Sequence, residues 1–140
     1  MTLQAQVTSL ELSKKLAELG IKQESIWYWG RWGKIWELVQ THPNANLDKY
    51  SAFSVAELGE LLPMVIDYKD DCFPRDDDAR RYWLDIQKHS SEWQVDYLWR
   101  DPDAHPYLKV LAELAARAPT EADARAKMLI SLIENKLISV

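Results

Sequence analysis

Residues 82–99, YWLDIQKHSSEWQVDYLW, contain two stretches in which apolar and polar side chains alternate. Alternation with a period of two is typical of strands that bury one face. A loop centred on the two adjacent serines pairs the stretches and places Ile86 opposite Val95. The apolar positions are Tyr82, Leu84, Ile86, Trp93, Val95, Tyr97 and Trp99. This stretch therefore predicts an antiparallel hairpin with one buried face.

The same register brings two carboxylates together on the other face of this hairpin, Asp85 opposite Asp96, beside Trp83. Opposed like charges destabilise a strand pair unless something offsets them. A divalent cation, a raised pKa or a substrate cation would do so, and paired carboxylates are common in acid–base hydrolysis. The alternative is that both carboxylates are solvated, or that an arginine bridges them, such as Arg31, Arg75 or Arg100. Trp83, Asp85 and Asp96 are thus one candidate binding site.

Residues 26–38, IWYWGRWGKIWEL, hold four of the seven tryptophans of the chain. A two-residue turn at Trp32 and Gly33 predicts a second hairpin, in which Trp29 faces Trp36. This register leaves Trp27, Trp29 and Trp36 on one face, while Ile26, Tyr28, Ile35 and Val39 share the other. The alternative turn, one residue earlier, sets Trp29 against Lys34 and is disfavoured.

Trp32 alone projects from the predicted turn, next to Arg31. An indole at a turn is costly to leave in water, so it either folds back onto the core or meets a partner. If it stays exposed, a protein partner or self-association is favoured over a sugar or nucleotide, because no polar groups converge on it in sequence. Trp32 and Arg31 form the second candidate binding site.

Three helices are predicted from their start signals. Capping boxes are expected at Thr8–Glu11 and Ser54–Glu57, and a weaker start signal at Thr120–Asp123. Gly20 ends the first helix in a left-handed conformation, and Pro63 stops the second. The third helix has an apolar face made of Ala122, Ala126, Leu129, Ile133 and Leu137. A further helix is expected at residues 107–116, from Leu108, Leu111 and Ala115.

This order of elements predicts an α+β fold with a mainly antiparallel sheet, built from the two hairpins, and helices packed on one face. The 140 residues fit a single domain, 1–140. Two polar stretches, residues 41–50 and 67–81, are interpreted as loops within it.

Composition restricts the function. A net charge of −5 lacks the basic footprint of a DNA or RNA binder, so nucleic acid is not an expected partner. No apolar run approaches the ~20 residues that cross a bilayer. The lone Cys72 and the lack of a signal-peptide pattern predict a cytoplasmic protein. His42, Cys72, His89 and His105 lack ligand spacing, so we expect no metal and no cofactor, and no catalytic motif is present.

Residues 12–29, 50–63 and 120–138 carry AELG- and TEADARAKMLI-type helices, with WQVDY between the second and third segments. They resemble short uncharacterised proteins encoded by bacteriophages, prophages and related mobile elements. The resemblance covers about half of the chain, and it implies a phage origin and an α-β-α sandwich-like fold, but no activity. The acidic stretch 70–78 and the stretch 100–118 depart from it.

The function expected from these observations is a non-enzymatic protein-interaction module of phage or mobile-element type. One alternative is a helix-turn-helix DNA-binding protein, in which residues 9–33 form two helices and Leu16, Gly20 and Ile26 take the buried positions and the turn. A second alternative is a small hydrolase or metal-binding protein that uses Asp85 and Asp96.

Overall fold

The computed structural model describes residues 1–40, 48–68, 80–100 and 108–140. The helices are α1 (Leu3–Gln6), α2 (Leu10–Glu18), α3 (Val55–Leu61) and α4 (Glu121–Glu134). The strands are β1 (Trp27–Trp32), β2 (Ile35–Gln40), β3 (Lys49–Ala52), β4 (Val65–Tyr68), β5 (Arg80–Lys88), β6 (Trp93–Arg100) and β7 (Leu108–Ala118). The α+β class is confirmed.

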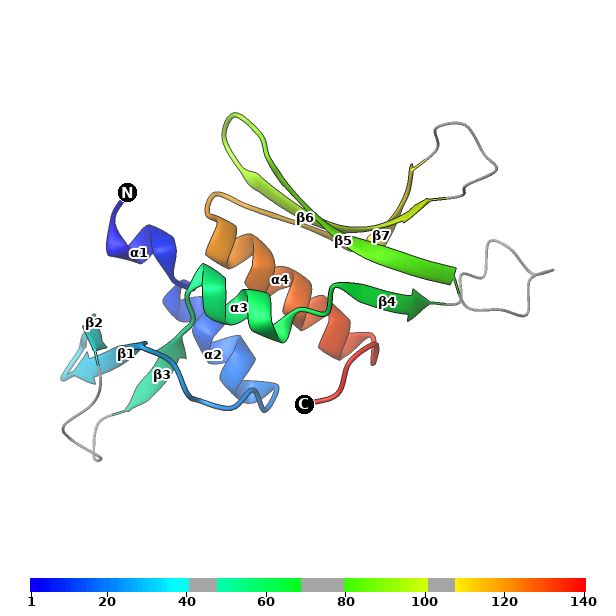
Figure 1. Ribbon diagram of the computed structural model, residues 1–140. Coiled ribbons are helices and arrows are strands. Elements are labelled where there is room, and N and C mark those ends of the chain that lie inside the picture. Colours follow the sequence, from blue (N-terminus) through cyan, green and yellow to red (C-terminus); the bar gives the residue numbers. More distant parts are fainter. Residues whose placement is uncertain (41–47, 69–79, 101–107) are drawn as a thin grey trace.

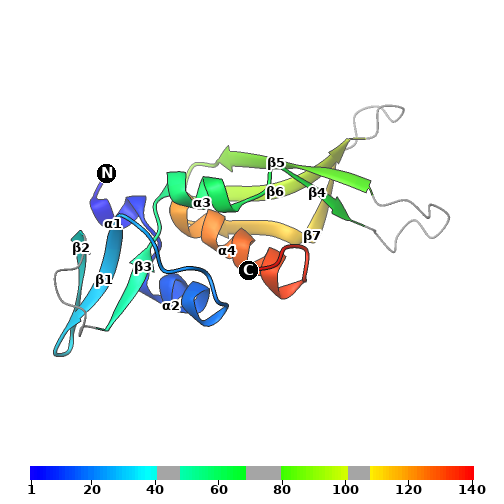
Figure 2. The ribbon, with the colours of Figure 1, turned by 60° about the horizontal axis from the view of Figure 1, so that its bottom comes forward.

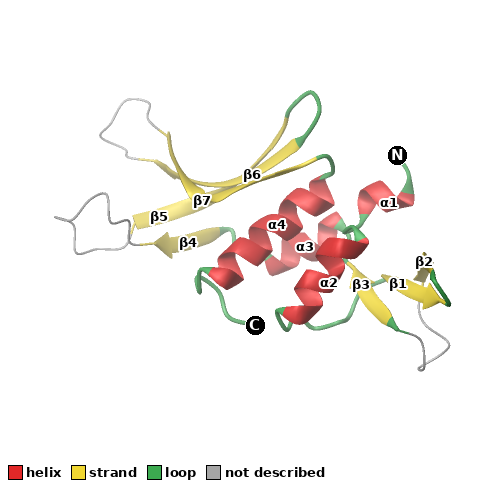
Figure 3. Cartoon of the chain, turned by 180° about the vertical axis from the view of Figure 1, so that it is seen from behind, coloured by secondary structure: helices red, strands yellow, loops and turns green. Residues whose placement is uncertain are grey.

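The strands form two antiparallel sheets, rather than the one that the sequence predicts. Three strands pair in the order β2-β1-β3 and four in the order β4-β5-β6-β7. Figure 1 shows α3 and α4 beneath the four-stranded sheet, with the three-stranded sheet beyond α2. Seen from behind in Figure 3, the helices again lie between the sheets. The helices therefore separate the hairpins, because each hairpin buries its apolar face against the helical layer.

The core is centred on α4, which packs against β6, β7, α2 and α3. Its side chains are buried nearly all round: Ala122, Ala124, Ala126, Met128, Leu129, Ile130 and Leu132. A helix that is apolar on most sides is typical of a central element. Of the predicted apolar face, Ala122, Ala126 and Leu129 are buried and Ile133 is partly buried, whereas Leu137 lies beyond the end of α4.

Two predicted helix starts are confirmed and one is wrong. Ser54 and Glu57 form the capping box of α3, and the Thr120 side chain accepts from the Asp123 amide at the start of α4. The N-cap of α2 is Ser9 instead of Thr8. The Thr8 hydroxyl is used elsewhere, since it lies 2.7 Å from the Ser13 hydroxyl and accepts from the Phe53 amide. Tertiary contacts therefore displace the predicted cap by one residue.

Both hairpins exist, and the register of the second is as predicted, with Ile86 opposite Val95 and Asp85 opposite Asp96. The register of the first is wrong by two residues. Trp29 pairs with Leu38, and Trp32 pairs with Ile35 across a turn at Gly33 and Lys34. Gly33 takes φ +62°, and glycine adopts this left-handed conformation most readily. A shift of two residues keeps every side chain on its face, so the predicted faces are confirmed.

The helix expected at residues 107–116 is wrong, because this segment is the strand β7, paired to β6. Where its side chains are described, Ala116 and Ala118 are buried and Arg117 is exposed, which is the period of a strand. The free edge of β6 supplies backbone hydrogen bonds, and small alanines let α4 pack closely on this strand. Pairing with β6 thus overrides the helical propensity of alanine.

The helix-turn-helix alternative is also wrong, because the residues after α2 form the hairpin of β1 and β2. Across the ranges that the structure describes, no helix is long and apolar enough to span a membrane. The predicted loops 41–50 and 67–81 lie largely outside the described residues, and His42, Cys72, Arg75 and His105 lie wholly outside them. The loop prediction is wrong at the described ends of the two stretches, because residues 49–50, 67–68 and 80–81 belong to β3, β4 and β5.

Candidate functional site

The outer face of the four-stranded sheet carries the predicted carboxylate pair. This outer face lies opposite the one that buries Tyr82, Val95 and Tyr97 in the core. Asp85 on β5 and Asp96 on β6 are directly opposite each other. Trp83, two residues before Asp85 on the same face, is 53% exposed. The structure therefore places Trp83, Asp85 and Asp96 side by side on one surface.

The two carboxylates differ in burial. Asp85 is partly exposed, whereas Asp96 is 1% exposed. Gln87 Nε2 donates to Asp85 Oδ2 at 2.6 Å, and Gln94 Nε2 donates to Asp96 Oδ2 at 2.5 Å. Oδ1 of Asp96 is buried and has no hydrogen-bond partner in the described parts of the chain. A buried acceptor without a partner costs about 1–3 kcal/mol, so this oxygen needs a proton or a donor that the described residues do not supply.

Burial raises the pKa of the Asp96 carboxyl above its ordinary value, and the Asp85 carboxylate raises it further. The hydrogen bond from Gln94 opposes this rise, as do the more distant charges of Arg117 and His89. The net direction is upward, because desolvation disfavours the charged form more than one amide donor favours it.

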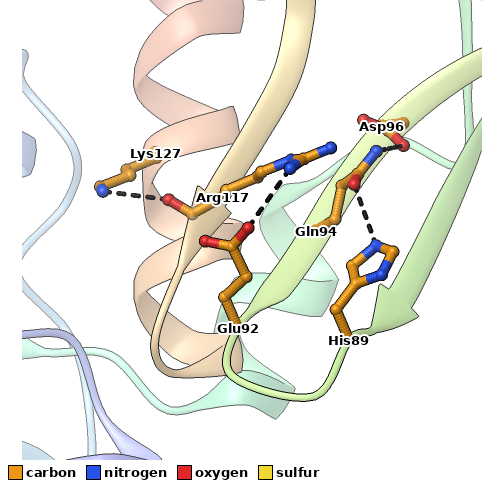
Figure 4. Close-up of polar contacts among 6 residues, drawn as sticks. All are labelled: His89, Glu92, Gln94, Asp96, Arg117 and Lys127. Carbon is orange, nitrogen blue, oxygen red and sulfur yellow. Dashed lines mark hydrogen bonds and ion pairs between the residues drawn. The ribbon is translucent and has the colours of Figure 1, made fainter.

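The cations near the pair are already engaged, as Figure 4 shows for Arg117. Arg117 Nη1 lies 3.3 Å from Glu92 Oε1, and His89 Nε2 lies 3.0 Å from Gln94 Oε1. On β5, Arg81 is paired with Asp67 at 3.3 Å. Within the described residues, no lysine or arginine pairs with either Asp85 or Asp96, so the predicted arginine bridge is not seen there.

The pair does not resemble a metal centre or a hydrolytic site. Among the side chains that the structure describes, no group of three histidine, cysteine, aspartate or glutamate residues could hold a metal ion. Catalytic acids and bases must reach the substrate, and Asp96 is 1% exposed with the Gln94 amide on its Oδ2, so this carboxylate is not open to a substrate unless that amide moves aside. The geometry favours binding over catalysis.

The second candidate site lies on the three-stranded sheet. Trp27, Trp29 and Trp36 face the helices: Trp29 Nε1 donates to the Thr8 carbonyl at 2.9 Å, and Lys14 Nζ lies 5.0 Å from the Trp36 ring centroid. The opposite side, which we call the hairpin face, consists of Tyr28, Trp32, Ile35 and Val39. Trp32 and Ile35 are paired across the turn and are 52% and 62% exposed. Trp32 has therefore not folded back onto the core.

Arg31 stabilises the turn beneath Trp32. Its Nε donates to the Gly33 carbonyl at 2.7 Å, and its Nη1 lies 3.8 Å from the Asp48 carboxylate. Gly30 keeps the hairpin face flat, because a Cβ there would lie 3.3 Å from Val39 Cγ2. Arg31 is thus a positioning residue for the turn, and the apolar surface belongs to its neighbours.

A cavity of about 360 Å³ lies where the N-terminal segment meets Trp27, Trp93 and the starts of α3 and α4. Its lining is mostly apolar, and the polar groups at the helix starts already act as caps or, for Glu121, bind Arg125. No polar group at these starts is left to orient a ligand. Sequence reasoning missed this cavity, because its walls come from five distant segments.

Strand alternation in the sequence places Gln87 and Gln94 on the outer face with the aspartates, but it does not predict that each glutamine donates to the aspartate two residues away. Comparisons with protein families, characterised proteins and solved structures give no match to this chain. Function is therefore argued from the geometry of the two sheets.

Proposed function

We propose that this protein is a non-enzymatic interaction module that binds a protein partner through the hairpin face. The observation that carries the proposal is the pair of Trp32 and Ile35, which are opposite each other and more than half exposed. Paired large apolar side chains in water are typical of interaction surfaces, and tryptophan is among the residues that contribute most to binding.

The position of the hairpin supports the proposal. β2 is an edge strand, since β1 lies between it and β3. Figure 2 shows the β1–β2 hairpin at one end of the molecule, away from the four-stranded sheet. A partner is thus able to reach the hairpin face and the edge of β2 together, and an added strand would supply backbone hydrogen bonds while the face supplies apolar contact.

Charge and resemblance point to the kind of partner. The net charge of −5 favours a partner with a basic surface. The resemblance to short phage and prophage proteins suggests a host or phage protein of the bacterial cytoplasm. Self-association through the same face is the other outcome that the exposed pair would support.

The test is site-specific crosslinking followed by titration. A photoreactive phenylalanine analogue replaces Trp32 in one sample and Met64 in another, and crosslinked proteins from bacterial cells that carry the gene are identified. The identified partner is then purified and titrated with wild-type protein and with Trp32→Ala, Ile35→Ala and Met64→Ala. Met64 is the matched control, because it is 66% exposed and lies on the turn before β4.

Trp32→Ala should weaken binding by about tenfold or more, Ile35→Ala by less, and Met64→Ala should leave the affinity unchanged. Wild-type affinity in Trp32→Ala, or an equal loss in Met64→Ala, would contradict the proposal. If the crosslinked species is a second copy of the chain, sedimentation of the same variants takes the place of the titration.

A further inference from the structure

The outer face of the four-stranded sheet holds a site that the hairpin proposal does not use. Asp85 and Asp96 are opposed on neighbouring strands, and both carboxylates are held through Oδ2 by a glutamine on their own strand. Among the described residues, no lysine or arginine forms an ion pair with either carboxylate, and the charges of Arg117 and His89 act on Asp96 only from a distance. The buried Oδ1 of Asp96 has no hydrogen-bond partner within the ranges that the structure describes. An opposed carboxylate pair with an unsatisfied buried oxygen favours the binding of a positively charged donor.

We propose that Asp85 and Asp96, flanked by Trp83, bind an organic cation through a single ammonium or guanidinium group. Side chains opposed across antiparallel strands have Cβ atoms about 4.5–5.5 Å apart, a spacing that lets one planar guanidinium or one ammonium contact both carboxylates. The partly exposed Asp85 forms the entrance. At Asp96 the cation takes the place of the partly exposed Gln94 amide at Oδ2, and a second N–H of the same cation donates to Oδ1, the oxygen without a partner among the described residues.

Trp83 distinguishes this site from a metal site. Its indole is 53% exposed and lies beside the carboxylate pair on the same face, two residues before Asp85. An aromatic face attracts ammonium and guanidinium groups, with a contribution that grows as the cation loses water. A metal ion would instead need more oxygen ligands, yet the two glutamines turn N–H groups toward the carboxylates and Gln94 Oε1 contacts His89.

The cation has two sources, a free polyamine or the side chain of a lysine or arginine on a protein, and the experiment separates them. The ¹H–¹⁵N spectrum of the full chain is recorded during titrations with methylguanidinium, spermidine, the peptide Gly-Arg-Gly and Mg²⁺. The reporters are the Trp83 indole N–H, assigned with Trp83→Phe, and the backbone amide of Asp96. If the peptide binds more tightly than methylguanidinium, the cation is the side chain of a protein. If spermidine binds most tightly, the cation is a polyamine.

We expect saturable shifts at both reporters with the organic cations. Asp85→Asn and Asp96→Asn should each weaken binding by about tenfold, and Trp83→Leu by about threefold. Asp67→Asn is the matched control, because it removes one negative charge from the same sheet and Asp67 is already paired with Arg81. It should change the affinity by less than about twofold.

Three results would overturn the proposal. The first is a linear shift without saturation, and the second is an equal loss in Asp67→Asn, since both indicate general electrostatic attraction. The third is Mg²⁺ binding at the same reporters that is as tight as that of the organic cations. The spectrum of each variant also reports its fold, so a loss of binding with an unchanged spectrum is attributable to the site.

Discussion

The backbone amide of Ser9 donates a 2.8 Å hydrogen bond to the Asp123 carboxylate, 114 residues further along the chain. Ser9 is the N-cap of α2, and Asp123 lies in the first turn of α4. A capping box normally takes this carboxylate from the third residue of the same helix. That residue of α2 is Leu12, so α4 supplies the missing half and the two helix starts are joined.

Replacing Asp123 should therefore destabilise both helix starts. Asp123→Ala leaves the Ser9 amide without its acceptor and removes a negative charge from the start of α4. We expect the free energy of unfolding to fall by about 1–2 kcal/mol, measured by urea denaturation. Asp123→Asn keeps an acceptor and should lose less than half as much. Equal losses in the two variants would show that only the charge matters.

Stability should depend on pH through Asp96. Its pKa is raised in the folded protein, so the folded state holds the proton more tightly than the unfolded state. The stability from the protonated form is fully present below the unfolded pKa of about 3.9, and it is lost as pH rises through the folded pKa. Asp96→Asn should gain stability relative to wild type as pH rises from about 4 to about 7.

Urea denaturation of both proteins at several pH values in that window measures the effect. Glu92→Gln is a suitable control, because Glu92 lies on the same hairpin and is paired with Arg117. A stability difference between Asp96→Asn and wild type that stays constant across the window would be evidence against the shifted titration.

Two buried hydroxyls should respond differently to removal. Ser51 and Thr8 are both fully buried, but Ser51 Oγ has no hydrogen-bond partner among the residues described, whereas the Thr8 hydroxyl contacts Ser13 and accepts from the Phe53 amide. Ser51→Ala should leave the thermal midpoint unchanged or raise it. Thr8→Val should cost about 1–3 kcal/mol, because it leaves the Phe53 amide without an acceptor. Similar losses in both variants would contradict this difference.

The sequence by itself determined the features that depend on neighbours along the chain. The start of α3, the left-handed Gly20 and the pairing of Asp85 with Asp96 follow from local spacing, and the structure confirms them. The faces of the first hairpin also follow from strand alternation, although the turn is displaced. A shift of two residues changes every partner but no face, so periodicity alone predicts the faces and leaves the register open.

Tertiary structure decided the features that depend on distant segments. Residues 108–118 form a strand because β6 offers an unpaired edge, although their alanines favour a helix. The N-cap of α2 falls at Ser9 because Phe53 and Ser13 occupy the Thr8 hydroxyl. Asp96 is flanked by Asp85 on β5 and Ala115 on β7, whereas the pairing of β4 with β5 ends at Trp83, before Asp85. Local propensities differ by less than about 1 kcal/mol per residue, so strand pairing and packing over a whole element exceed them.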